Sequence, residues 1–597
     1  MPFGRTLHIY GYVWMLALPL PHLGNKVYID ENALQPAQVN TYWNWGDVGH
    51  ADNYLRELEE LRDRNASSDE RATYFMTEFL KLGIPAATQN YSFSTLTGLL
   101  NGSNAYAVFR SPRTSGTEAV VISASWTSMT GGHNLRGVST ILALSAFLRK
   151  YSHWSKDLIF VISDNYLDGM HAWASSYHGV TQSNLAAEPL TLSSGVIWTA
   201  LNIDYPGHSF SHLGFFREGL NGRLPNQDLI NSFGIISHFT GGVPIVMYDH
   251  REPTEYPGRQ QTLAAIPSWV PKSFAERQDV LDYAYRARNI LKHASHQARG
   301  TASGVHGLLH QFRIDAITLY AVPSNGPHGF HALGRVVEST LRTMGNLLER
   351  LHASFFFYIM TTPQKFLKIG MYLPSAILVG AALMFGGLGA WVQSGWIEVL
   401  DEDICVEGKT VVQPSPQKKW VRRSRGFLDV FVLSSCTYHL GVILFAVLRI
   451  PQFLSAQSTW TPALALVLGV LPLAVLALPG PPSSRAPTWI VLKAATLCLA
   501  SAVISVTSVL NFSLAALLAV TLGVPLSVAS PSPSVSSRVV KYSVYAVLAF
   551  GWLFLPEEVQ QAMWQWNVLG VWFAPLVCQV YVPLMLTAGV VCLLPPS

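Results

Sequence analysis

Charged residues are almost absent from the last third of this chain. Between Phe427 and Ser597 the sequence holds eight of them in about 170 residues. Over the whole chain 13% of residues are charged, against about 25% in an ordinary soluble domain. Such a composition is typical of helices that cross a bilayer, because a charged side chain is costly in hydrocarbon. It excludes a plain soluble enzyme as the description of the whole chain.

Eight apolar segments are long enough to cross a membrane, which takes about 17 to 25 residues. We expect them near 7–24, 366–395, 427–448, 460–479, 488–510, 512–530, 540–556 and 567–594. The first is short and contains Pro19 and Pro21, so a signal peptide is the alternative. No small-residue cleavage site follows it, and we therefore expect a retained anchor.

The distribution of Lys and Arg predicts the topology. The loop between the second and third segments carries six of them, and the positive-inside rule places such a loop in the cytoplasm. We therefore expect an anchor at 1–24, a large hydrophilic domain at 25–365 and a multi-span domain at 366–597. The cytoplasmic loop lies near 396–426. By this count both termini are cytoplasmic and the large domain is lumenal.

Three glycosylation sequons support a lumenal location. They begin at Asn65, Asn90 and Asn101, all in the hydrophilic domain, and glycosylation requires lumenal exposure. All five cysteines lie outside this domain, so we expect no disulfide within it.

Strand and helix patterns alternate through the hydrophilic domain. Continuous apolar runs predict strands, and apolar residues at helical spacing predict the helices between them. The strands are expected at 104–109, 118–124, 158–163, 196–203 and 314–321, and the helices at 51–64, 69–82, 137–151, 165–178 and 275–296. This order predicts an α/β domain with a mostly parallel sheet and helices on both faces.

The segment 331–352 has the clearest helical pattern, with one apolar stripe. It runs into the aromatic cluster Ser354–Tyr358, of the kind found at membrane interfaces. We expect this helix to lead the domain onto the bilayer. The alternative is a helix that covers the sheet, and both could hold.

The region from Val120 to Asp204 resembles the co-catalytic zinc aminopeptidase fold, but without its ligands. That family places His-x-Asp, Asp-Asn-x-x-Gly and Asp-Gly-Glu-Glu at strand ends and loops. Here Ser125 and Thr127 stand at the first motif, His133 in the second, and Tyr166 and Leu167 at the Glu pair. At the next strand end only Asp204 keeps a ligand-type side chain.

The chemistry of hydrolysis decides what these replacements mean. Two zinc ions need around six oxygen or nitrogen ligands and a carboxylate general base. Without the Glu pair we expect no catalytic residues and no metal. A single metal ion held by the remnant His133 and Asp204 is the alternative. The sequence also has no Gly-x-Ser-x-Gly elbow and no Walker motif.

Four long segments make the resemblance more specific. They are Tyr28–Ala33, Glu218–Asn231, His306–Leu319 and Leu347–Tyr358. With the topology, they resemble the GPI anchor attachment protein family, the peptidase-like subunit of the GPI transamidase complex of the endoplasmic reticulum membrane. The resemblance implies a non-hydrolytic subunit, since the catalytic cysteine belongs to a caspase-like subunit. It also implies GPI, precursor proteins and the other subunits as partners.

The resemblance directs attention to the lumenal membrane surface. Two segments must lie there, one after the first span and one before the second. We hypothesise that they face each other around the GPI headgroup. The residues expected to bind it are Tyr28, Asp30, Glu31, Arg350, His352 and Ser354, and Pro575 in the final span is expected to open a lipid groove.

Three other functions remain open. A membrane-tethered zinc aminopeptidase-like hydrolase requires the missing ligands. A transporter requires ionisable residues inside the membrane, for which Lys493 alone is thin support. A protein-docking scaffold without lipid contact has no distinguishing sequence feature. A nucleic-acid partner is not expected, because no basic run with interleaved aromatics occurs.

Overall fold

The computed structural model describes residues 2–29, 41–113, 116–346, 356–400, 418–480, 482 and 484–596. The chain divides into two compact units. The first, the apolar unit, comprises Met1–Leu16, Leu373–Met563 and Trp572–Ser597. The second, the α/β unit, comprises Ala17–Tyr372 and the short segment Trp564–Val571.

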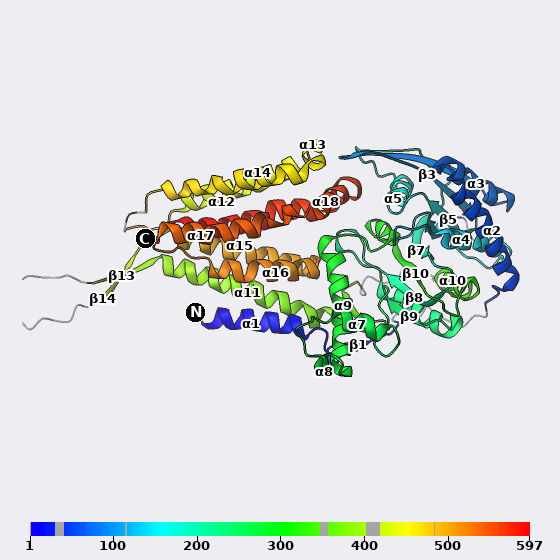
Figure 1. Cartoon of the computed structure of the whole chain (residues 1–597), viewed down its shortest axis with the longest axis horizontal. Coiled ribbons are helices and arrows are strands. Elements are labelled where there is room, and N and C mark those ends of the chain that lie inside the picture. Colours follow the sequence, from blue (N-terminus) through cyan, green and yellow to red (C-terminus); the bar gives the residue numbers. More distant parts are fainter. Residues whose placement is uncertain are drawn as a thin grey trace, which may run out of the picture. The chain divides into compact units, whose positions relative to one another are not determined.

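The α/β unit is built on a nine-stranded mixed sheet (Figure 1). The four central strands β5, β4, β7 and β10 are parallel, and β3 and β8 flank them in antiparallel pairs. Across the sheet the strands are β6 (Leu185–Ala187), β2 (Ala86–Thr95), β3 (Gly98–Phe109), β5 (Asp157–Ser163), β4 (Glu118–Ser125), β7 (Val196–Asp204), β10 (Asp315–Pro323), β8 (Phe210–Phe216) and β9 (Ile245–Met247).

The α/β fold class is confirmed, and all five expected strands are present. They form the contiguous middle of the sheet, β3-β5-β4-β7-β10, of which β3 is the antiparallel member. The four strands that the sequence did not reveal lie at the two sides. These strands lack a long apolar run. In β2, for example, Thr, Gln, Asn and Ser interrupt the apolar residues, and β6 and β9 have only three residues each.

Helices cover both faces of the sheet, as expected. The helices α2 (Trp45–Asp63), α3 (Ser68–Lys81), α4 (Leu135–Leu148) and α10 (Phe330–Gly345) pack on one face, and α5 (Asp168–Tyr177) and η3 (Val305–Phe312) on the other. The N-cap of α3 is Ser67. Its hydroxyl accepts from the Glu70 amide in a capping box.

Helix α10 bears out one of the two alternatives within its described part, and its role in leading the domain onto the bilayer stays a prediction. Its stripe of Leu333, Val336, Val337 and Leu341 is buried in the core of the α/β unit. Its Glu338 carboxylate accepts from the backbone amides of Tyr42 and Trp43. Phe330–Gly345 is therefore a sheet-covering helix, and residues 347–352 lie outside the described part of the chain.

The expectation of an aromatic interface cluster is wrong for Tyr358. This side chain is 2% exposed, and its hydroxyl donates to the Pro225 carbonyl at 2.9 Å. Tyr358 begins β11 (Tyr358–Thr362), which pairs with β12 (Lys365–Lys368). The edge of β12 then pairs with β1 (Asn25–Lys26), so that the two ends of Ala17–Tyr372 meet in one small sheet.

The α/β unit has further helices. It contains α6 (Gln227–Ile236), α7 (Gly258–Ala265), α8 (Lys272–Ala275) and α9 (Gln278–Arg299). The expected helix 275–296 corresponds to α9. A three-residue turn, η1 (Leu220–Gly222), follows β8.

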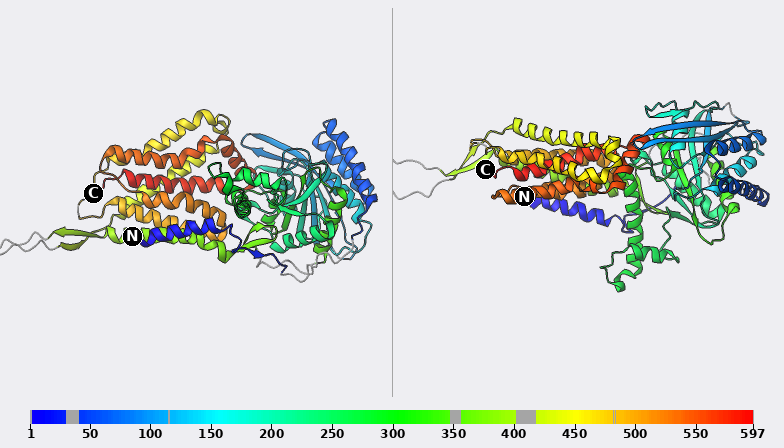
Figure 2. Two further views of the ribbon diagram at one scale, coloured as in Figure 1. Left: turned by 60° about the horizontal axis from the view of Figure 1, so that its bottom comes forward. Right: turned by 45° about the horizontal axis from the view of Figure 1, so that its top comes forward.

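The apolar unit is a set of long helices that run beside one another (Figure 2). Among the described residues five are long and apolar enough to cross a membrane: α11 (Ile369–Ser394), α12 (Phe427–Leu448), α14 with η5 (Gln457–Ala477), α15 (Thr488–Leu510) and Phe573–Leu593. A sixth results if Val535–Phe554 and Pro556–Leu569, bent by 74°, form one broken span.

Two further expected spans correspond to shorter helices, α1 (Pro2–Ala17) and α16 (Phe512–Val528). The total of eight spans therefore stays a prediction. Within the loop expected in the cytoplasm, β13 (Trp396–Leu400) pairs antiparallel with β14 (Lys418–Arg422).

Candidate functional site

Asp204, the last ligand-type residue of the peptidase-like frame, holds a loop. It ends β7 with 1% of its surface exposed. Its carboxylate accepts from the Ser128 hydroxyl at 2.7 Å and from the Met129 amide at 2.8 Å. Burial raises the pKa of Asp204 to about 6, against these two hydrogen bonds. Both carboxylate oxygens therefore serve the loop after β4.

His133, the other expected remnant ligand, is an exposed side chain. Its ring lies 5.7 Å from the Trp126 ring, and its backbone forms an isolated bridge with Thr127. Among the described residues, no group of three or more His, Cys, Asp or Glu side chains could hold a metal ion.

The positions of the missing ligands carry side chains of another kind. The Ser125 hydroxyl donates to the Thr127 carbonyl at 2.9 Å. Burial and the neighbouring Asp204 raise the pKa of the Tyr166 phenol, which therefore stays protonated. At these two positions the chain therefore presents protonated hydroxyl groups where the peptidase family has metal-ligating side chains.

A second group of carboxylates lies in the loop between β5 and α5. Asp164 accepts from Ser68 at 2.7 Å and pairs with Arg71 at 2.5 Å. Asp168 accepts from the Tyr91 hydroxyl at 2.8 Å and from the Asn165 amide at 3.0 Å, and burial raises its pKa. Because each carboxylate has protein donors, this group fixes the loop to β2 and α3.

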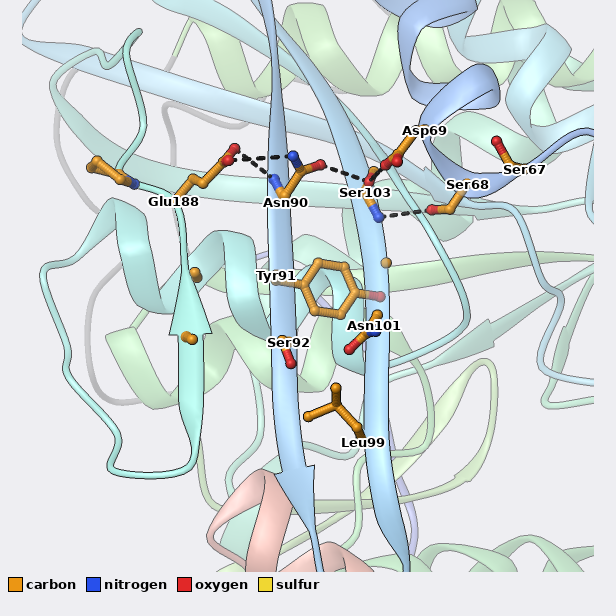
Figure 3. Close-up of a pocket in the computed structure, with 14 residues that line it drawn as sticks. Ser67, Ser68, Asp69, Asn90, Tyr91, Ser92, Leu99, Asn101, Ser103 and Glu188 are labelled. Atoms are coloured by element: carbon orange, nitrogen blue, oxygen red, sulfur yellow. Dashed lines mark hydrogen bonds between the residues drawn. The ribbon is translucent and has the colours of Figure 1, made fainter.

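A groove of about 840 Å³ opens beside this loop, across β2, β3 and the start of α3 (Figure 3). Its walls include the sequon residues Asn90 and Asn101. Asn90 lies between Glu188, to which its amide donates at 3.3 Å, and Ser103, whose hydroxyl donates to it at 2.7 Å. Asn65, Asn90 and Asn101 are all exposed. Glycosylation at Asn65 and Asn101 stays a prediction, whereas the bonds of Asn90 to Glu188 and Ser103 disfavour a glycan at that position.

Two fully buried charges follow β8, and neither was among the expected site residues. Arg217 and Glu218 are both 0% exposed. Glu218 Oε1 lies 2.8 Å from His293 Nδ1 and also accepts from the Tyr248 hydroxyl. Burial by itself would raise the pKa of Glu218, but Arg217 and His293 outweigh it and hold that pKa well below its usual range. The sequence feature that could have indicated this site is the charged pair Arg217-Glu218 directly after an apolar strand.

Three of the four segments that carry the family resemblance meet near Glu218. His306 Nδ1 lies 2.8 Å from the Thr318 hydroxyl, and His310 Nε2 lies 2.9 Å from the Ala316 carbonyl. Gly219 packs so closely on the His310 ring that a Cβ atom would overlap it. The Tyr358 hydroxyl joins this region through Pro225. These segments therefore pack against one another beside the buried Glu218.

The residues expected to bind the GPI headgroup are described in part. Tyr28 is 45% exposed, its ring lies 6.3 Å from Phe366, and its carbonyl accepts from the Asn231 amide at 2.7 Å. Pro575 is buried within α19 (Phe573–Leu576). The other expected residues, Asp30, Glu31, Arg350, His352 and Ser354, lie outside the described part of the chain.

Comparison with known proteins gives one family. Residues 101–589 match the family described as Gaa1-like, GPI transamidase component. One similar protein is the GPI transamidase component gaa1 of Schizosaccharomyces pombe, which is 29% identical over 65% of this chain and 64% of its own length. Another is the GPI transamidase component GAA1 of Saccharomyces cerevisiae, which is 28% identical over 66% of this chain and 57% of its own length. The chain thus spans about three fifths of the length of these relatives.

Among solved structures, the chain is similar to the glutaminyl cyclase of Fimbriiglobus ruber. The sequence identity is 12%, the match covers 52% of this chain and 98% of the cyclase, and the TM-score is 0.32.

Proposed function

The chain belongs to the Gaa1-like family of GPI transamidase components, and from this membership we propose that it binds GPI and helps to present it to the caspase-like catalytic subunit. In this role it is a non-hydrolytic subunit. The catalytic cysteine lies in the partner subunit, which attaches GPI to the C-terminus of a precursor protein. The other transamidase subunits, the precursor and the membrane are the remaining partners.

The observation that carries this proposal is the small sheet β1-β12-β11. The proposed headgroup site requires the segment after the first apolar helix and the segment before α11 to lie together. In the sheet, Asn25 lies opposite Phe366 and Lys26 opposite Lys365, and the Val27 amide donates to the Gln364 carbonyl at 3.0 Å. These pairs support the idea that the two chain segments flank one site.

The chemistry next to this sheet suits an anionic headgroup. Lys26 and Lys365 face each other in the ladder, and two like charges in that position repel unless an anion lies near them. The exposed Tyr28 phenol can donate a hydrogen bond to a phosphate or sugar oxygen. The Asn231 amide holds the Tyr28 backbone in place for this contact.

The residues at the peptidase-like positions of the described α/β unit support the division of labour between subunits. At the strand ends of the α/β unit, Asp204 serves the loop after β4 and Tyr166 stays protonated. These residues provide no activated water. The remaining task for the chain is to bind and place the lipid, whose acyl chains the apolar helices can contact.

The same proposal includes the placement in the cell. The chain is a multi-pass protein of the endoplasmic reticulum membrane, with an anchor at 1–24, the domain 25–365 in the lumen and the multi-span domain at 366–597. Both termini are cytoplasmic. The apolar helices and the exposed sequons support this placement.

The decisive experiment measures GPI retained by the purified complex. The variant combines Tyr28→Ala with His352→Ala, and the control combines Tyr256→Ala with His238→Ala, which replaces an exposed Tyr and His elsewhere on the α/β unit. We expect the first variant to retain less GPI and the control to retain as much as the parent chain. Unchanged retention in an assembled complex would favour the scaffold without lipid contact.

A further inference from the structure

An eight-residue segment from the C-terminal part of the chain is built into the α/β unit. Trp564–Val571 belongs to that unit, while its neighbours Met563 and Trp572 belong to the apolar unit. The segment consists of the end of α18 (Pro556–Leu569) and the two residues after it. The final apolar helix, Phe573–Leu593, begins directly afterwards.

The end of α18 needs partners, because the last carbonyls of any helix have no acceptor role inside it. Here side-chain amides from the loop between α5 and β6 donate hydrogen bonds to these carbonyls. Gln182 Nε2 donates to the carbonyls of Asn567 and Val568, both at 3.1 Å, and Asn184 Nδ2 donates to the Asn567 carbonyl at 2.7 Å. The helix is therefore capped by a remote part of the chain, since Gln182 and Asn567 are 385 positions apart in sequence.

A third amide comes from one of the segments that identify the family. Asn221, in η1, donates through Nδ2 to the Gly570 carbonyl at 3.2 Å. The Asn221 backbone is in the left-handed region with φ 55°, and its backbone N–H donates to the Gly300 carbonyl at 2.9 Å. This conformation, which Asn tolerates better than most residues, directs the turn toward the C-terminal segment.

Apolar contacts accompany the three amides. Val568, Leu569 and Val571 are 0%, 4% and 1% exposed. Val571 packs so closely on Gly300 that a Cβ atom there would lie 3.3 Å from Val571 Cγ1. Asn567 Nδ2 also donates to the Ser94 carbonyl at the end of β2, at 3.4 Å. The fit involves β2, the loop before β6, η1 and the end of α9.

A buried histidine orients the central amide. His171 Nε2 lies 3.1 Å from Gln182 Oε1, and burial lowers the pKa of His171. Since the Gln182 amino group donates to two carbonyls, its oxygen is left to accept from His171. The contact with His171 therefore orients the Gln182 amide so that its amino group faces the helix carbonyls.

We propose that Gln182, Asn184 and Asn221 form a receptor for Trp564–Val571, and that they are positioning residues which hold the start of the final apolar helix in place for lipid binding. The receptor claim concerns only the contact between these side chains and Trp564–Val571. The positioning claim rests on the proposed GPI-binding function. The receptor gives a role to the Leu220–Gly222 turn that the headgroup site does not use.

The test uses the full chain in its complex with Gln182→Glu and Asn184→Asp combined. These changes keep the side-chain shapes but place carboxylate oxygens against carbonyl oxygens, and Gln260→Glu on the exposed surface of α7 adds charge without this contact. Two to three lost hydrogen bonds predict amide exchange at 564–571 at least about tenfold faster, with β4 unchanged. Unchanged exchange at 564–571 would overturn the receptor.

A second readout separates the two halves of the proposal. A photoactivatable GPI analogue is cross-linked to each complex, and the label on Trp572–Leu593 is measured. We expect the variant to lose most of the label that the parent chain acquires, and Gln260→Glu to keep it. Equal labelling with faster exchange would refute the positioning role. No label in the parent chain would refute GPI binding by the final helix, while the exchange result still decides the receptor.

If the double variant fails to assemble, Asn184→Asp alone removes the 2.7 Å contact and leaves the Gln182 pair in place. The same two readouts then apply, with a smaller expected change in exchange.

Discussion

Glu218 Oε1 and His293 Nδ1 lie 2.8 Å apart, and neither side chain reaches solvent. The carboxylate comes from the residues after β8 and the imidazole from α9, so the contact joins the sheet to the long helix. Arg217 lies within 3.5 Å of the same oxygen. The three groups form one buried charge network in which each member depends on the others.

Replacing Glu218 with Ala should destabilise the α/β unit strongly. Arg217 would keep its buried charge without the carboxylate, and breaking a buried pair in this way costs about 3 to 5 kcal/mol. The free energy of opening, measured by amide exchange in β8 and α9, reports the loss. Glu276→Ala, at an exposed position, is the control and should change it by less than about 0.5 kcal/mol.

The pH dependence gives an independent check on Glu218. Its folded pKa lies below the unfolded value, so the carboxylate contributes its full stability above the unfolded pKa and loses it as the pH falls through the folded pKa. The parent chain should therefore weaken on acidification below about pH 4.5 more than Glu218→Ala does. An identical acid profile in the two proteins would contradict the network.

The middle of the sheet could be predicted from sequence, and this charge network could not. Strands β4, β5, β7 and β10 are continuous apolar runs because both of their faces are buried, and that pattern is visible in the letters alone. Glu218 and His293 are 75 positions apart, and nothing local to either residue indicates that they meet. Long-range contacts between polar residues leave no periodic signal.

For Asp204 we predict a pH dependence of stability with the opposite sign to that of Glu218. Its folded pKa of about 6 is above the unfolded value, so the folded protein binds the proton more tightly and loses stability as the pH rises from about 4 to 6. The loss corresponds to about 3 kcal/mol. Asp204→Asn should remove this slope in the amide exchange of β7, and Asp52→Asn, at an exposed position, should leave it unchanged.

The outcome for Asp204→Asn also bears on the peptidase-like frame. If the parent chain shows no slope between pH 4 and 6, the carboxylate is already ionised with a partner that the protein itself does not provide. A bound cation would have this effect, and it would revive the single-metal alternative at Asp204.

The three sequons should not behave alike. Asn101 is exposed and its side chain makes no hydrogen bond within the described residues, whereas Asn90 bridges Glu188 and Ser103. We expect Asn101→Gln and Asn65→Gln each to remove one glycosidase-sensitive step of gel mobility. Asn90→Gln should remove none, but should cost about 1 to 2 kcal/mol through its lost hydrogen bonds. A mobility step lost with Asn90→Gln would show that this bridge does not exclude a glycan.

The proposed headgroup site illustrates why family resemblance and local pattern reach different residues. The resemblance pointed to Tyr28, and the structure adds Asn231, which holds the Tyr28 carbonyl. Asn231 lies in the middle of α6 among apolar residues. In the sequence, an Asn at this position looks like no more than a residue of low helix propensity. Its role depends on a chain segment about 200 positions earlier.

Gly570 offers a test of the C-terminal segment that uses the backbone alone. It has φ 68° directly after α18, a conformation that costs a residue with a Cβ atom about 1 kcal/mol. Gly570→Ala should therefore loosen Trp564–Val571 and speed its amide exchange about fivefold, with the Gln182 and Asn184 side chains intact. Gly49→Ala in α2, where a Cβ atom meets no neighbour, is the matched control and should leave exchange at 564–571 unchanged. If Gly570→Ala has no effect either, the segment is held by its apolar contacts and the left-handed turn is not needed to seat it.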